Sequence, residues 1–193
     1  MTKAALLSRG LLLEYITLGW NVVGVAIVLA AARAAGSVAL AGFGLDSLIE
    51  IFASLVVVWE LKNIAQRRQR HTLRLIGVAF LLLSLYIVVQ SIYTLSTKLH
   101  PAPSLGGMAW LLATFMAMLL LAWGKQVTGT ALDNAVLKTE GRVTLIDALL
   151  AGAILIGLVL NALLGWWWAD PLASLVIVFY GIKEGWHALH GEE

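Results

Sequence analysis

The chain has 193 residues, of which 61% are hydrophobic and only 12% are charged. A soluble domain carries about 25% charged and about 45–50% apolar residues, so this composition excludes a water-soluble globule. The 13 basic and 11 acidic residues leave a net charge of +2, which is too small a surplus to indicate a nucleic-acid partner. Because cysteine is absent, disulfides and thiolate metal sites are excluded, and any metal must be bound by oxygen or imidazole.

Six apolar stretches are long enough to cross a bilayer, which requires about 20 mostly apolar residues. Segments this long and this uniformly apolar predict helices rather than barrel strands. The predicted fold is an all-α polytopic membrane protein, in which a single domain over residues 1–193 forms a bundle of six transmembrane helices. The expected spans are Leu11 to Ala32, Ser37 to Leu61, Leu73 to Thr97, Leu105 to Gly124, Arg142 to Leu164 and Asp170 to His187.

Lysine and arginine are distributed unevenly between the two ends of these spans. With a cytoplasmic N-terminus, the inner side carries eleven basic residues and the outer side only Arg33 and Lys98. The positive-inside rule therefore predicts that both termini are cytoplasmic, and the cell (inner) membrane is the expected location. The inner set includes the basic run at residues 67–70 and a predicted loop from Lys125 to Arg142.

The outer turn before the last span contains an Asp-Pro pair. Asp170 followed by Pro171 has the chemistry of a helix start, with a capping carboxylate and a proline in the first helical position. Asp170 is therefore assigned a structural role.

Three other acidic residues lie well inside the predicted spans, where a carboxylate costs about 2.5–3.5 kcal/mol and is a functional residue by default. Asp46 and Glu50 lie four residues apart in the run GFGLDSLIE, and therefore share one helical face, whereas Asp147 belongs to the fifth span. Helical rise places Glu50 about 20 Å inward from Ser37 and Asp147 about 25 Å inward from Leu164, at comparable depths.

No lysine, arginine or histidine is predicted at that depth, so three converging carboxylates would repel one another unless a cation or protons joined them. Oxygen ligands suit hard or borderline divalent cations, and the pattern therefore indicates a metal or proton pathway. The alternative is three separate acids that face water-filled gaps or hydrogen-bond to other helices.

Three further polar residues in or near the spans are accessory candidates. Asn21 offers an uncharged oxygen at mid-depth, or an interhelical hydrogen bond. Glu14 lies one to two turns inside the membrane surface, where it either attracts cations or extends its carboxylate to the interface. Glu140 precedes Asp147 by seven residues, and so lies on its face near the cytoplasmic mouth as a candidate for the access path.

Two stretches of the sequence resemble the transmembrane domain of the cation diffusion facilitator, or cation efflux, family. They are AAGSVALAGFGLDSLIEIFASLVVVWEL in the second span and VTLIDALLAGAILIGLVLNALLGWWWADPLASLVIV across the fifth and sixth. The resemblance implies a six-helix, typically homodimeric exporter that exchanges a divalent metal for protons. It also implies that two carboxylates one turn apart on the second helix bind the metal, which here are Asp46 and Glu50, together with a pair on the fifth helix that ends at Asp147.

The sequence departs from the family pattern at several positions. The first ligand of the fifth-helix pair falls on Val143, which cannot bind metal, so that water, Asn21 or Thr144 would have to complete the coordination shell. Glu50 stands where aspartate is usual. The chain ends at Glu193, and the C-terminal cytoplasmic domain common in the family is expected to be absent.

The sequence therefore predicts a secondary transporter that exports a divalent cation, with Mn²⁺, Fe²⁺, Co²⁺, Zn²⁺ and Cd²⁺ as open alternatives and no tightly bound cofactor. The expected partners are the lipid bilayer, metal ions, protons and a second copy of the chain, and no nucleic acid. One alternative is a non-transporting membrane subunit or metal sensor on the same scaffold, and another is a transporter of a non-metal cation. An enzyme is not expected, because no nucleophile and base pair lies at depth.

Overall fold

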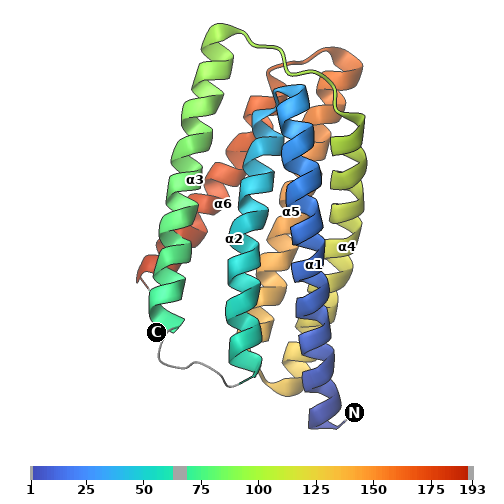
Figure 1. The fold of residues 1–193 in the computed structure, drawn as a ribbon, viewed down its shortest axis with the longest axis vertical. Coiled ribbons are helices and arrows are strands. Elements are labelled where there is room, and N and C mark those ends of the chain that lie inside the picture. The colour runs from blue at the N-terminus through green and yellow to red at the C-terminus, as the bar shows by residue number, and fades with distance from the viewer. Residues whose placement is uncertain (1, 63–68, 191–193) are drawn as a thin grey trace.

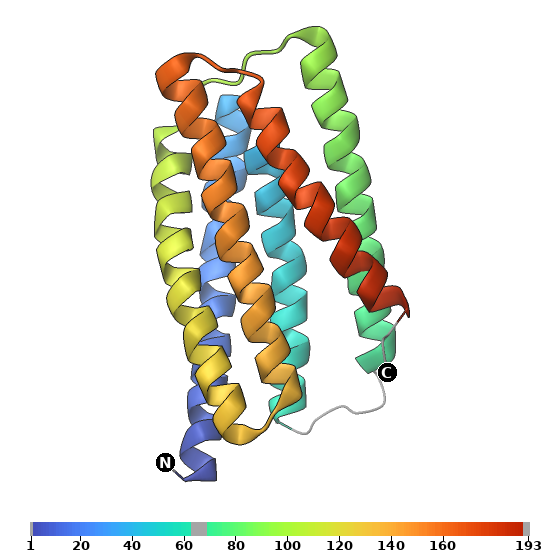
Figure 2. The same cartoon turned by 180° about the vertical axis from the view of Figure 1, so that it is seen from behind.

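The computed structural model describes residues 2–62 and 69–190, which form six α-helices that run alternately up and down in one bundle (Figures 1 and 2). Within these residues there is no β-strand. The helices are α1 Lys3–Ala35, α2 Val38–Leu61, α3 Gln69–Thr97, α4 Leu105–Leu132, α5 Ala135–Leu164 and α6 Ala169–His190. The predicted all-α bundle is confirmed. The two ends of the chain lie at the same end of the bundle, here called the terminal end, and the other is called the far end (Figure 1).

Four of the described helical stretches are long enough and apolar enough to cross a membrane. They are Lys3–Ala35, Gly77–Thr97, Leu105–Leu132 and Val136–Leu164. Many large apolar side chains on their outer surfaces are exposed, among them Leu82, Leu120 and Ile156. An apolar exterior of this kind suits contact with lipid rather than with water.

Sequence predicted the helix ends more accurately at the far end than at the terminal end. The ends at Thr97, Leu105 and Leu164 lie where they were expected. The predicted inner loop from Lys125 to Arg142 is wrong, because α4 continues to Leu132 and α5 already begins at Ala135. Of the basic run at residues 67–70, Arg67 and Arg68 lie outside the described residues.

Two cap residues reduce that predicted loop to a tight turn. Asp133 adopts the left-handed conformation with φ of 49°, which short polar residues tolerate better than others, and it ends α4. Asn134 begins α5 by accepting a hydrogen bond from the Leu137 amide at 2.8 Å. The charged residues on either side of the turn therefore belong to helices, and a break in hydropathy did not mark a break in the helix.

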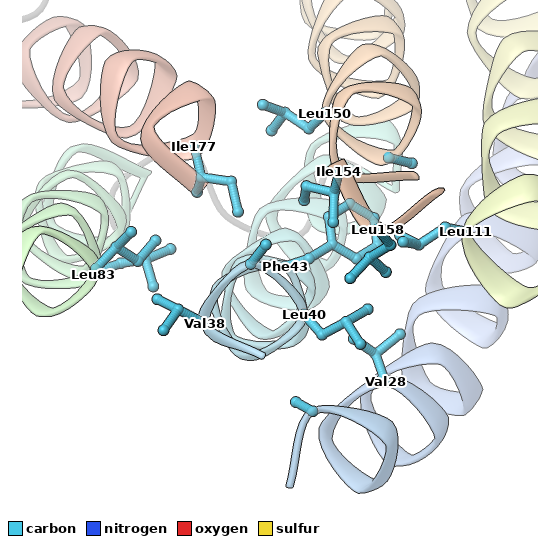
Figure 3. Close-up of a cluster of buried hydrophobic side chains, with 14 of the residues drawn as sticks. Val28, Val38, Leu40, Phe43, Leu83, Leu111, Leu150, Ile154, Leu158 and Ile177 are labelled. Atoms are coloured by element: carbon cyan, nitrogen blue, oxygen red, sulfur yellow. The ribbon is translucent and has the colours of Figure 1, made fainter. Parts of the chain in front are cut away.

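The core is concentrated toward the far end around α2, which contacts α1, α3, α5 and α6. Phe43 and Leu40 of α2 lie between Val28 of α1 and Leu158 of α5 (Figure 3). All four side chains are at most 1% exposed. The packing thus places α2 in contact with four of the other helices.

The N-terminus of α2 is capped by a residue from another helix. Asp170 lies in the first turn of α6 and accepts hydrogen bonds from the Ser37 hydroxyl, the Val38 amide at 3.0 Å and the Ala39 amide at 3.4 Å. The expectation that Asp170 caps its own helix is therefore wrong, since α6 already begins at Ala169. Free amides and the helix dipole at the start of α2 favour this carboxylate, and the contact joins α6 to α2.

Replacing Asp170 by alanine removes the acceptor for the first amides of α2 and for Ser37. We expect Asp170→Ala to lower the free energy of unfolding by about 2 kcal/mol, and Asp170→Asn by less, because the amide oxygen still caps a helix. Thermal unfolding of the detergent-purified variants measures both effects. Equal losses in the two variants would contradict the capping role.

Candidate metal site

A small cavity between α2, α3, α5 and α6 contains all three acids that the sequence singled out. Its volume is about 20 Å³, which is room for a water-sized occupant. Asp46 and Glu50 line it from α2, and Asp147 lines it from α5. Their side chains are deeply buried, with 4%, 4% and 2% of each residue exposed. The structure therefore brings the predicted acids from two helices to one cavity.

The remaining walls of the cavity are mostly apolar and come from three helices. Val143, Ile146 and Leu150 belong to α5, Phe80 belongs to α3, and α6 contributes Ile177, Tyr180, Gly181 and Glu184. Val143 lies one turn before Asp147 on the same face, as its sequence position predicted. No ligand atom is therefore available from this position, and the polar side chains of the otherwise apolar lining offer only oxygen ligands.

Asp147 is the buried polar side chain whose bonding is least complete. Both of its carboxylate oxygens are buried and lack a hydrogen-bond partner. Glu50, in contrast, accepts a hydrogen bond from Asn21 Nδ2 of α1 at 2.9 Å. Buried polar atoms are almost always hydrogen-bonded, so the two free oxygens of Asp147 indicate a position that needs a proton or a cation.

The three acids share a cavity without forming a closed coordination shell. Over residues 2–62 and 69–190, no three side chains of histidine, cysteine, aspartate or glutamate are gathered closely enough to hold a metal ion. Ligation by all three carboxylates therefore requires their side chains to converge further on the cavity. Asn21 adds a neutral amide that reaches Glu50 and fixes the orientation of that carboxylate.

The other accessory candidates lie around a buried lysine that sequence reasoning placed in a loop. Lys125 of α4 is fully buried, and its ammonium group contacts Glu14 Oε2 at 3.2 Å, Glu140 Oε1 at 3.3 Å and Thr144 Oγ1 at 3.0 Å. The expectation that no basic side chain lies at depth is therefore wrong. Ser54 of α2 also donates to Glu140, at 3.4 Å.

This lysine network, formed by Lys125, Glu14, Glu140 and Thr144, gives these residues a different setting from the three cavity acids. The Lys125 ammonium is a counter-charge for both glutamates, and the Thr144 hydroxyl donates to the backbone oxygen of Glu140 at 2.9 Å. None of the four is among the described residues that line the cavity. The network links α1, α4 and α5 beside the cavity.

The burial of Lys125 could have been predicted from the sequence. The buried residues of α4 recur at the spacing of one helical face, through Met118, Leu121 and Ala122 to Lys125 and Thr128. A lysine on the buried stripe of an apolar helix requires an acidic partner, and Glu14 occupies the equivalent stripe of α1. Glu184 was also missed, although it lies on the face of α6 that carries Ile177 and Tyr180.

The bundle and its intramembrane carboxylates define a polytopic membrane protein with a candidate cation site, and the comparison with known families agrees. Residues 74–190 match the family described as Cation efflux transmembrane domain. The chain therefore belongs to this family. The matched region contains Asp147 and Val143 of α5 and all of α6.

Three relatives extend the comparison. The chain is 30% identical to Transmembrane protein 163 of Xenopus laevis, in an alignment that covers 74% of this chain and 54% of that protein. It is 28% identical to proteins named Cadmium, cobalt and zinc/H(+)-K(+) antiporter from Bacillus subtilis (strain 168) and from Bacillus velezensis, over 58% of this chain and 35% of each relative. The chain thus spans about half the length of these relatives or less.

The lysine network predicts a large difference between two lysine substitutions. Lys125→Met leaves Glu14 and Glu140 buried without a counter-charge, and we expect the free energy of unfolding to fall by about 3–5 kcal/mol. Lys138→Met is the matched control, because Lys138 pairs at 3.0 Å with Asp133, whose side chain is 96% exposed. Such a surface pair contributes about 0–1 kcal/mol.

Thermal unfolding in detergent compares the two variants, and the triple variant Lys125→Met, Glu14→Gln, Glu140→Gln should recover much of the lost stability. If Lys125→Met were no less stable than Lys138→Met, the lysine network would not stabilise the buried glutamates through the charge of Lys125.

Proposed function

We propose that the protein is a secondary transporter that moves a divalent metal cation out of the cytoplasm in exchange for protons, with Asp46, Glu50 and Asp147 as metal ligands. The observation that carries the proposal is the cavity in which these three buried acids meet, with both oxygens of Asp147 unpartnered. Membership of the cation efflux transmembrane domain family also supports metal transport. Transport rather than catalysis is therefore the proposed activity.

Proton exchange follows from the chemistry of the ligands. Carboxylates bind a metal in their ionised form, so metal and protons compete for the same oxygens. Three ionised acids without a counter-ion are costly inside an apolar bundle, and protons are the natural replacement when the metal leaves. A site that is loaded with metal from one side and with protons from the other acts as an antiporter if it opens alternately to the two sides.

The proposed substrate is a divalent ion that accepts oxygen ligands. Two relatives are named as antiporters of cadmium, cobalt and zinc, which supports a transition-metal substrate for this chain. Because Val143 replaces a nitrogen or oxygen ligand, the remaining all-oxygen set favours a harder ion such as Mn²⁺ over Zn²⁺. We also propose a homodimer in the cell (inner) membrane with both termini cytoplasmic.

Neutralising any one of the three acids tests the proposed site. We expect Asp46→Asn, Glu50→Gln and Asp147→Asn each to abolish metal transport, because each removes a ligand and a negative charge. The membrane-inserted amount should change little, since removal of a buried acid also removes a cost of burial. Uptake of Mn²⁺, Fe²⁺, Co²⁺, Zn²⁺ and Cd²⁺ into proteoliposomes provides the measurement.

Asp133→Asn serves as the control, because it removes an exposed acid from the turn between α4 and α5. Wild-type transport by Asp147→Asn would eliminate the proposed site. Metal binding without transport in the unmodified protein would favour a sensor or subunit instead. Transport that does not respond to an imposed proton gradient would eliminate the antiport element alone.

The position of Val143 predicts a change in metal preference. Val143 lines the cavity one turn from Asp147, and imidazole is a good ligand for Zn²⁺. We therefore expect Val143→His to raise the ratio of Zn²⁺ to Mn²⁺ transport at matched protein levels. Leu145→His, on the exposed face of the same helix, is the control. An unchanged ratio in folded Val143→His would show that this position does not reach the ions.

A further inference from the structure

One face of α6 forms a wall of the cavity and becomes more accessible toward the terminal end. Ile177, Tyr180, Gly181 and Glu184 follow one another on this face. Ile177 is 1% exposed, whereas Glu184, two helical turns further on, is only half-buried. The lining therefore connects the deeply buried acids to a more open position, and that position carries a carboxylate.

The Glu184 carboxylate has no counter-charge in the part of the chain that the structure describes. The ion pairs there join Lys125 to Glu14 and Glu140, and Lys138 to Asp133. The neighbouring Lys183 places its ammonium group over the Tyr180 ring, 6.0 Å from the ring centre. Glu184 is thus free to meet a cation, whereas the two glutamates that the sequence suggested for this task already share Lys125 as a counter-charge.

We propose that Glu184 is the residue that first receives the cation at the terminal-end mouth of the cavity and delivers it to Asp46, Glu50 and Asp147. The proposal rests on the proposed function, since it assigns an access residue to the same site. A negative charge at the mouth of a cavity with apolar walls concentrates the electric field and raises the local concentration of cations. The unpartnered oxygens of Asp147, which line the same cavity, are the destination for the ion.

If Glu184 receives the cation first, removal of its charge should change the apparent affinity for the cation more than the maximal rate of transport. We expect Glu184→Gln to raise the Co²⁺ concentration for half-maximal proteoliposome transport about five-fold, with the maximal rate unchanged. The effect should shrink as ionic strength rises, because salt screens a charge near water. Asp133→Asn, which removes another negative charge near the terminal end, should leave the concentration dependence unchanged.

The absence of cysteine allows a second test that does not depend on transport. Glu184→Cys and Asp133→Cys each introduce a single thiol, and both should react with water-soluble methanethiosulfonate reagents. The Asp133 position, whose native side chain is 96% exposed, provides the reactive reference. In Glu184→Cys, attachment of a sulfonate group should restore Co²⁺ transport at low concentration, whereas attachment of an ammonium group should reduce it further.

These results separate the access role from a structural one, because a structural role would not follow the sign of the attached charge. An unreactive thiol in Glu184→Cys, beside a reactive one in Asp133→Cys, would overturn the proposal even if the protein transported no metal. Normal concentration dependence in Glu184→Gln would overturn it as well. Loss of Co²⁺ transport in Asp147→Asn together with normal kinetics in Glu184→Gln would leave the proposed function intact and refute the access role alone.

Discussion

Compensation of buried charge is the constraint on which the rest of this bundle depends. An apolar interior tolerates an ionised side chain only where an opposite charge or several hydrogen bonds replace water. Lys125 is the counter-charge that Glu14 and Glu140 share, and its contacts join α1, α4 and α5. The cavity acids have no such lysine in direct contact, and their compensation must come from protons or from an ion that enters.

The two groups of acids therefore divide the interior into a part with a fixed counter-charge and a part that the proposed function makes exchangeable. In the fixed part, the counter-charge is covalently attached to α4 and cannot leave. In the exchangeable part, Asn21 holds Glu50 while Asp147 remains without a partner. The proposed transport site needs this difference, because an ion that is bound as permanently as the Lys125 ammonium would never be released.

Contacts from neighbouring helices hold α2, which carries two of the cavity acids, in position. Asp170 of α6 caps the start of α2, and Asn21 of α1 reaches Glu50 near its middle. The far-end core around Phe43 fixes the level of Asp46, one turn further along α2. Toward the terminal end, α6 diverges from α5 and approaches α3 (Figure 2). Glu184, on this part of α6, is more exposed than Ile177, which lines the same cavity.

The amino-acid sequence by itself determined the class of fold and singled out the three buried acids that line the cavity. Uniform hydropathy requires helices in lipid, and an acid within such a stretch is conspicuous because its cost is high. Only the tertiary structure decided which polar groups meet. Lys125 and Glu14 are 111 residues apart, and Asp170 caps a helix that begins 132 residues earlier. Such pairs depend on how helices pack side by side, which hydropathy along one chain does not encode.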